Sequence, residues 1–345
     1  MSHPANRIAS DDRSAPGIKD IALKSGVSIA TVSRVLNGNS TVAPALRERV
    51  DAAVAALGYR PNLMARNLRT QRTGSVGVIV PNIGNAYFAD IVRAAQDTAT
   101  AAGYTVLVMN SDGSTAQEEA AIRTLDDHQV EGLLLVSASS AVGPALRTLM
   151  TRGIAVLAAD RGLQRAGVDH VLVDVRAGTR EAVAHLVAHG RRRIALIGGP
   201  GDVWTAREKL KGYQEGLHAA GLTLDDSLIF DGNYTYEGGE QQARALIGLG
   251  CHVDAVIVAN NLMALGAMRT LLRQGVKIPS ELALVGYDDA AWMDVVQPTV
   301  SVVSQPTRLL GTEAMRLLLE RIASPLTRPV TRLKLPTRLI IRESS

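Results

Sequence analysis

The chain has 345 residues, of which 46% are hydrophobic and 20% charged, with one cysteine and a formal net charge of +4. This composition excludes a disordered, collagen-like or disulfide-framework protein, and the length suffices for two or three domains. Residues 1–16 are polar, and no later stretch of about 18 residues is apolar throughout. We therefore predict a disordered tail, a cytoplasmic location and no insertion into a membrane.

Positive charge is concentrated at the start of the chain. Residues 1–73 hold 11 Lys and Arg against 5 Asp and Glu, whereas residues 74–345 hold 26 against 28. Because phosphates respond to local rather than total charge, this asymmetry favours a polyanion-binding module attached to a nearly neutral body. A solvated basic face is the alternative that charge alone leaves open.

Three short helices are predicted within the basic segment. The first runs from Ile18 to Ser25, the second follows a Ser28 cap, and the third opens at Pro44, a residue suited to the first helical position. A further helix of about nine residues is predicted in the linker after residue 60. It is too short to be stable alone in water, so it should need a partner to fold.

From Ser75 onward, apolar runs alternate with amphipathic helices. Strands that are apolar throughout and separated by helices indicate parallel sheets covered on both faces. The length of this region exceeds one usual core, so two α/β lobes are predicted. The expected strands are 76–80, 105–109, 132–136, 155–160, 193–199, 254–260 and 282–288, and the expected helices include 88–102, 116–129, 178–189, 206–220 and 262–274.

The segment from residue 18 to residue 38 has the spacing of a helix-turn-helix. Its second helix should present Ile29, Ala30 and Arg34 outward, where side chains reach base edges in the major groove of DNA. The Arg34 guanidinium is suited to donate two hydrogen bonds to a guanine. A packed pair of helices without a DNA role is the alternative on spacing alone. The expected phosphate contacts are Thr31, Ser33, Asn37 and Tyr59.

Polar side chains follow several predicted strands at their carboxyl ends, where parallel sheets bind ligands. Carboxylates and amides there can hydrogen-bond to hydroxyl groups, while aromatic rings can cover the apolar face of a sugar. Taken singly, each residue also fits a helix cap or a satisfied strand end. The polar candidates are Asn82, Asn85, Asp160, Arg161, Asn260 and Asp288, and the aromatic candidates are Tyr87, Phe88, Tyr234 and Trp292.

These residues carry a resemblance to a known family. Residues 17–73, with KDIALKSGVSIATVSRVLNG, closely resemble the DNA-binding headpiece of the LacI/GalR family. The remainder resembles that family's periplasmic-binding-protein-like effector domain through VGVIVPNIGNAYF, GGPGDVWTAREKLKGY, VANNLMALGAMR and VGYDD. The resemblance implies a homodimeric repressor that binds double-stranded operator DNA under the control of a small molecule. It implies a sugar or sugar derivative as effector, with a nucleobase or nucleoside as the alternative.

The resemblance also assigns roles to individual residues. It implies that residues 61–73 form a hinge helix on the operator, in which Leu68 acts as an apolar wedge that opens a base step in the minor groove. Without the resemblance, Leu68 would be an ordinary linker residue packed on the body. The expected DNA contacts are Ser28, Ile29, Ala30, Thr31, Ser33, Arg34, Asn37, Tyr59, Asn62, Ala65, Leu68 and Arg69, and the expected effector contacts are Asn85, Tyr87, Phe88, Asp160, Arg161, Thr205, Lys209, Tyr234, Asn260, Asp288, Trp292 and Gln305.

Four positions depart from the family pattern. Gly17 and Ala43 stand where Thr and Ser usually cap the first and third helices, and Ala supplies no side-chain acceptor. Lys209 replaces an arginine that grips ligands with a planar fork, so its contact should be less directional. Asn261 replaces an acidic residue that is common after the matching asparagine. The last two departures leave the identity of the ligand open.

The expected fold is an α/β body of two periplasmic-binding-protein-like lobes with parallel sheets, preceded by an all-α helix-turn-helix domain. The expected divisions are a tail at 1–16, a headpiece at 17–60, a hinge at 61–73 and a body at 74–345, with one lobe at about 74–174 and 306–332 and the other at about 175–305 and 333–345.

No cofactor, metal or catalytic centre is expected. His185 and His189 lie four residues apart but lack the HExxH context and third ligand of a zinc site. The glycines at 198–201 fit neither a dinucleotide fingerprint nor a P-loop, no nucleophile motif is present, and Cys251 is expected to be inert packing. The rival interpretations are a small-molecule-binding protein without a DNA role and an enzyme that uses the cleft.

Overall fold

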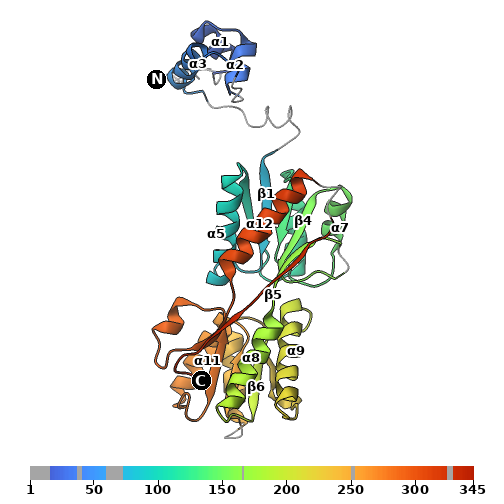
Figure 1. Ribbon diagram of the computed structural model, residues 1–345, viewed down its shortest axis with the longest axis vertical. Coiled ribbons are helices and arrows are strands. Elements are labelled where there is room, and N and C mark those ends of the chain that lie inside the picture. The colour runs from blue at the N-terminus through green and yellow to red at the C-terminus, as the bar shows by residue number, and fades with distance from the viewer. Residues whose placement is uncertain (1–15, 37–40, 60–72, 165–166, 250–252, 325–328) are drawn as a thin grey trace, which may run out of the picture. The chain divides into compact units, whose positions relative to one another are not determined.

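The computed structural model describes residues 16–36, 41–59, 73–164, 167–249, 253–324 and 329–345. The chain divides into two compact units, Met1–Thr73 and Gly74–Ser345 (Figure 1). The predicted tail, apart from its last residue, and nearly all of the predicted hinge lie outside the described residues. Among the helices that the structure describes, none combines the length and apolar character needed to cross a membrane.

The first unit contains the three predicted helices, α1 (Ile18–Ser25), α2 (Ile29–Leu36) and α3 (Pro44–Leu57). Their spacing places Ile21, Val32 and Val50 together in a small core with no exposed surface. Three apolar side chains from three short helices therefore bury one another. Isolated helices of this length are at best marginally stable in water, so this packing stabilises them.

The ends of these helices show how the two departures in capping are accommodated. The backbone amide of Gly17 donates to Asp20 Oδ2 at 2.7 Å, so a carboxylate three residues later satisfies the amide at the start of α1. Ser28 Oγ accepts from the Thr31 amide at 3.1 Å and caps α2 as predicted. Ala43 makes no side-chain cap for α3, also as predicted. Gly26 ends α1 at φ 65°, a left-handed conformation that glycine adopts without strain.

The second unit has two six-stranded sheets, each in its own lobe (Figure 1). The first sheet has the order β11-β5-β4-β3-β1-β2, and all of its strands are parallel. Its strands are β1 (Ser75–Val80), β2 (Thr105–Asn110), β3 (Gly132–Leu135), β4 (Ala155–Asp160), β5 (Asp169–Val173) and β11 (Arg332–Leu335), and its helices are α5 (Ala86–Ala101), α6 (Thr115–Asp127), α7 (Pro144–Thr151) and α12 (Thr307–Ala323).

The second sheet has the order β12-β10-β9-β8-β6-β7 and is parallel except for β12, which runs antiparallel to β10. Its strands are β6 (Ile194–Gly198), β7 (Ile229–Asp231), β8 (Ala255–Val258), β9 (Ala283–Tyr287), β10 (Ser301–Ser304) and β12 (Arg338–Ile340). Its elements also include α8 (Val175–Ala188), α9 (Trp204–Ala219), α10 (Tyr236–Gly248), α11 (Asn261–Arg273) and the short helices η1 (Asp226–Leu228) and η2 (Ala291–Asp294).

The chain passes between the lobes three times, after β5, after β10 and after β11. The last crossing differs from the predicted division at residue 332. β11 pairs with β5 through Leu335, so residues 333–335 belong to the first sheet rather than the second lobe. Because each lobe is built from separate stretches of chain, neither is complete until the chain reaches its last strands.

Gly311 sits where α12 crosses α5 at close range. A Cβ atom at this position would lie 2.3 Å from the Ile91 carbonyl oxygen, and backbone cannot move aside as a flexible side chain can. We expect Gly311→Ala to destabilise residues 74–345 by about 1–3 kcal/mol in urea unfolding. The control is Gly248→Ala, where none of the described residues outside its own turn of α10 comes within 4 Å of the added Cβ. That change should be neutral or stabilising, and equal losses for the two variants would contradict the steric explanation.

Candidate functional site

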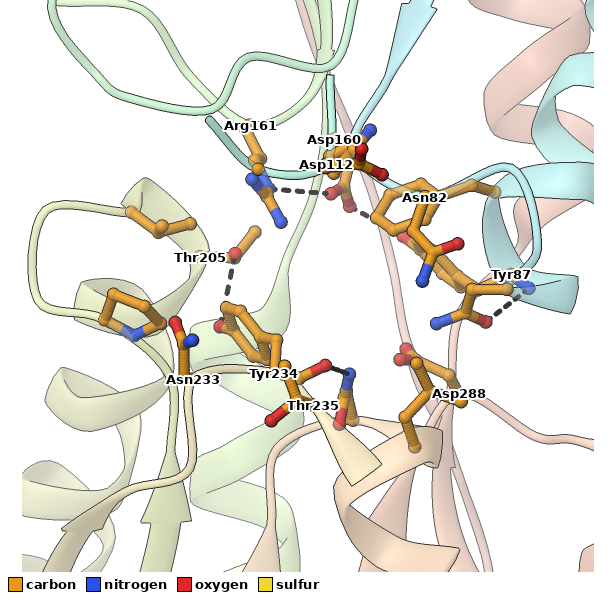
Figure 2. A pocket seen from close by; sticks show the side chains of 18 of the residues that line it. Asn82, Tyr87, Asp112, Asp160, Arg161, Thr205, Asn233, Tyr234, Thr235 and Asp288 are labelled. Carbon is orange, nitrogen blue, oxygen red and sulfur yellow. Dashed lines mark hydrogen bonds and ion pairs between the residues drawn. The ribbon is translucent and has the colours of Figure 1, made fainter. Parts of the chain in front are cut away.

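A cavity of about 220 Å³ lies between the two lobes, and the loops that follow the carboxyl ends of strands in both sheets form its wall (Figure 2). Asp160 ends β4 in the first lobe, and Asp288 follows β9 in the second. Parallel strands that end at one edge bring such side chains together. The cavity is therefore a polar pocket to which both lobes contribute.

All of the predicted effector contacts except Trp292 line this pocket. Trp292 is the exception because η2 turns it onto the core of the second lobe, where it packs as a partly buried side chain. The pocket residues from the prediction are Asn82, Asn85, Tyr87, Phe88, Asp160, Arg161, Thr205, Lys209, Tyr234, Asn260, Asp288 and Gln305.

Several pocket residues were missed by the sequence reasoning. Asp112 and Pro200 follow β2 and β6, so the strand-end rule applied to every predicted strand would have found them. Asn233 and Thr235 follow β7, a three-residue strand that the sequence pattern did not reveal. The remaining lining residues are Pro81, Gly113, Val203 and Leu262.

Asp160 and Asp288 occupy corresponding positions in the two lobes. Both have left-handed backbone conformations, with φ 61° and φ 62°, which aspartate tolerates better than most residues. Both are buried, and burial raises the pKa of each carboxyl above its usual range. Hydrogen bonds from Tyr87 to Asp160 and from Gln305 to Asp288 act in the opposite direction. Strain and burial of this kind are typical of residues kept for binding.

Two buried cations face these carboxylates. Arg161 Nε lies 3.9 Å from Asp160 Oδ2 and has no hydrogen-bond partner among the described residues. Lys209 Nζ donates to the Ala259 carbonyl at 2.6 Å and lies 4.0 Å from the centre of the Tyr287 ring. Burial lowers the pKa of Lys209, whereas Asp288 and Asp160 raise it. The buried wall of the pocket thus sets two cationic groups beside two carboxyl groups.

Tyr234 forms an aromatic wall of the pocket (Figure 2). Its backbone has φ 55°, rare for an aromatic residue, and its carbonyl accepts from Asn260 Nδ2 at 3.1 Å. Its ring lies 5.9 Å from the Arg161 guanidinium, and burial raises its pKa to about 12, so the hydroxyl is neutral at physiological pH. The strained backbone conformation of Tyr234 therefore places its ring in the wall of the cavity.

A pair of amides joins the lobes beside the pocket. Asn85 Nδ2 donates to Asn261 Oδ1 at 3.0 Å, and Asn261 Nδ2 donates back to Asn85 Oδ1 at 2.9 Å. Asn85 also caps α5, and Asn261 begins α11. An ionised acidic side chain at 261 could accept the bond from Asn85 but could not donate one in return. This departure from the family pattern therefore creates a reciprocal contact between the lobes.

We expect Asn85→Ala and Asn261→Ala to be coupled. Each single change leaves a buried amide without its partner and should cost about 1–3 kcal/mol in urea unfolding of residues 74–345. The double variant should lose less than the sum of the two, by about 1 kcal/mol, because the pair is then removed together. Strictly additive losses would show that the two amides do not stabilise each other.

The headpiece presents its predicted base-reading side chains to solvent. Ile29 is 47% exposed, and Ala30 and Arg34 on the same helix are also exposed. Ser28 and Thr31 hydroxyls bond to each other at 2.9 Å, and Tyr59 packs partly on the small core. Ser33 is half-buried. The other predicted DNA contacts, Asn37, Asn62, Ala65, Leu68 and Arg69, lie outside the described residues.

Family profiles match both units of the chain. Residues 17–62 match the profile described as bacterial regulatory proteins, lacI family. Residues 73–343 match the profile described as periplasmic binding proteins and sugar binding domain of LacI family.

Individual relatives extend over almost the whole chain. The HTH-type transcriptional regulator CelR of Thermobifida fusca is 37% identical over 339 residues, which cover 96% of this chain and 99% of CelR. Catabolite control protein A of Priestia megaterium is 32% identical, with coverage of 95% and 98%. These relatives are transcriptional regulators rather than enzymes.

Solved structures give the same picture. A CelR complex with cellobiose has a TM-score of 0.74 and 35% identity, covering 96% of this chain and 100% of that one. A lac repressor dimer bound to operator and the anti-inducer ONPF has a TM-score of 0.86 and 28% identity, covering 96% and 99%.

Proposed function

Since the chain belongs to the LacI family of bacterial regulatory proteins, we propose that it is a cytoplasmic repressor of carbohydrate metabolism genes whose effector is a sugar or sugar derivative. The observation that carries this proposal is one chain that joins an exposed recognition helix to a polar pocket between two lobes. The protein would bind its effector without transforming it.

The chemistry of the pocket supports a polyhydroxylated ligand. Asp160 and Asp288 offer carboxylate acceptors on opposite sides, and Asn260 and Lys209 add groups that bond to hydroxyls. The Tyr234 ring offers a face for an apolar sugar surface. The CelR structure holds cellobiose, and the lac repressor structure holds ONPF, so relatives with this architecture bind small molecules that include a sugar.

Control of DNA binding would follow from the connections between the lobes. A ligand that contacts both Asp160 and Asp288 favours one relative orientation of the lobes over another. We propose that residues 61–73 respond as a hinge in a homodimer, with Ala65, Leu68 and Arg69 against the minor groove and Asn62 as a further DNA contact. A coupling of about 1–3 kcal/mol would change operator affinity ~5–150-fold.

The experiment is selection of binding sites from random duplex DNA with the full-length protein, followed by a panel of sugars, sugar acids and nucleosides. We expect a palindromic site, bound more weakly or more tightly when one sugar is added, and no selection by residues 74–345 alone. Equal selection by residues 74–345 would refute the headpiece role. A response to a nucleoside but to no sugar would refute the assignment of the effector.

A further inference from the structure

Four side chains form a continuous line across the pocket from one lobe to the other. Tyr87 Oη lies 2.6 Å from Asp160 Oδ1 and 3.2 Å from Gln305 Oε1, and Gln305 Nε2 lies 2.5 Å from Asp288 Oδ1. Tyr87 belongs to α5 of the first lobe, and Gln305 lies at a crossing between the lobes. The two strained carboxylates are therefore connected through a hydroxyl and an amide.

The hydrogens available in this line do not suffice for its contacts. Three contacts join the four groups, and a full hydrogen bond in each contact needs its own hydrogen between the two polar atoms. The Tyr87 hydroxyl has one hydrogen to donate. The Gln305 amide donates only from its nitrogen, so it can supply a hydrogen either toward Tyr87 or toward Asp288 but not toward both. Ionised carboxylates supply none. With both aspartates ionised, one contact brings two oxygens together without a hydrogen.

Turning the Gln305 amide over does not remove the shortage. With the Gln305 oxygen facing Tyr87, the Tyr87 hydroxyl donates its only hydrogen to Gln305. Asp160 must then carry a proton and donate it to the Tyr87 oxygen. With the Gln305 amide turned over, its nitrogen donates to Tyr87 and its oxygen faces Asp288, so Asp288 must carry the proton. Both complete arrangements contain one protonated carboxyl group.

We infer that Asp160 and Asp288 share a single acid proton through Tyr87 and Gln305 when the pocket is empty. Passing from one arrangement to the other carries one proton from Asp160 to Asp288. Asp160 gives its proton to Tyr87, Tyr87 gives its own to the Gln305 oxygen, and that oxygen delivers it to Asp288 once the amide has turned, so the proton belongs to the pair. Tyr87 is thus a positioning residue that links the carboxylates, in addition to lining the pocket.

The surroundings of the two carboxyls are compatible with this proton. Burial raises the pKa of both Asp160 and Asp288, and their mutual repulsion raises that of Asp288 further. Arg161 beside Asp160, and Lys209 from α9, which faces both, favour ionisation. A backbone hydrogen bond from Asn261 also favours the ionised form of Asp288. These cations would hold the second carboxyl ionised once the first has taken the proton.

The consequence for the effector rests on the proposed function. A polyol that donates hydroxyl hydrogens to Asp160 and Asp288 supplies the hydrogen that the line of side chains lacks. The shared proton would therefore be released to solvent as the ligand binds. Effector binding would therefore release a proton and strengthen as the pH rises through the shared pKa.

The test is infrared spectroscopy of the ligand-free full-length protein at about pH 7, where exposed aspartates, with a pKa of about 3.9, have lost their acid carbonyl band. We expect the wild type to retain the band of one protonated carboxyl group. Asp160→Asn and Asp288→Asn should each abolish it, because either new amide supplies the missing hydrogen.

Two matched variants should keep the band. Asp112→Asn changes an exposed carboxyl of the same pocket. Glu118→Gln changes a buried carboxyl outside it, whose pKa is raised by burial and lowered by hydrogen bonds from Ala138 and Ser137. Absence of the band from the wild type would overturn the inference, and this result needs no variant to fold. Loss of the band in only one of the two aspartate variants would also overturn it, by assigning the proton to one residue. Neither outcome depends on which effector the protein binds.

Discussion

Replacing Asp288 by alanine is expected to weaken effector binding by about 2–5 kcal/mol, a factor of ~30–5000, with little change in the DNA affinity of the ligand-free protein. The carboxyl is buried and accepts from Gln305 Nε2 at 2.5 Å. Its removal takes a hydrogen-bonding partner from the ligand and leaves Lys209 without one of its counter-charges. Calorimetry with the sugar found in the panel measures the loss.

The control for this prediction is Asp288→Asn. Asparagine keeps the size of the side chain and tolerates the left-handed backbone at φ 62°, whereas alanine adds strain. The asparagine variant should therefore lose effector affinity with little loss of stability. If either variant responds to the effector as the wild type does, Asp288 makes no contact that matters to the ligand.

Replacing Arg34 by alanine is expected to cost about 1–3 kcal/mol for each half-site, confined to one base position. Arg34 is exposed on α2, on the helix face that it shares with Ala30 four residues earlier. Its guanidinium therefore projects from the side of the helix that is predicted to enter the major groove. Binding to a series of operators with single base changes measures the effect, and the variant should no longer discriminate at one symmetric position.

The matched control is Arg34→Lys, which keeps the charge but loses the planar pair of donors. It should retain most of the non-specific affinity and its dependence on salt, and still lose the base preference. A uniform loss of affinity over all operator sequences in the alanine variant would instead identify Arg34 as a phosphate contact.

The sequence pattern predicted the strands that form clear apolar runs, including the edge strand β2. It missed β5, β7, β10, β11 and β12. β4 and β8 are completely buried, so nearly every position had to be apolar and the run was visible. β11 places Arg332 and Lys334 in solvent, and its sequence does not form an apolar run. The missed strands are only three to five residues long, and their apolar runs are too short to be distinguished along the chain.

The pocket was predictable where one local rule applied. Asp160 and Asp288 were found because each lies at the end of an apolar strand. The pairing of Asn85 with Asn261 joins residues that are 176 positions apart in the chain, and a local sequence pattern cannot predict a contact over that separation. Trp292 was wrongly placed because its neighbour Met293 is fully buried in the second lobe and fixes the turn of η2.

The interleaving of the lobes has a consequence for the protein during its synthesis. The headpiece helices end at Leu57, whereas the first sheet lacks its edge strand until Leu335 and the second until Ile340. At about 5–20 residues per second, the ribosome needs about 14–57 s to cover that interval. A newly made headpiece therefore emerges well before the unit that would regulate it is complete, and nascent chains pass through a period in which any DNA contact is beyond the control of the effector.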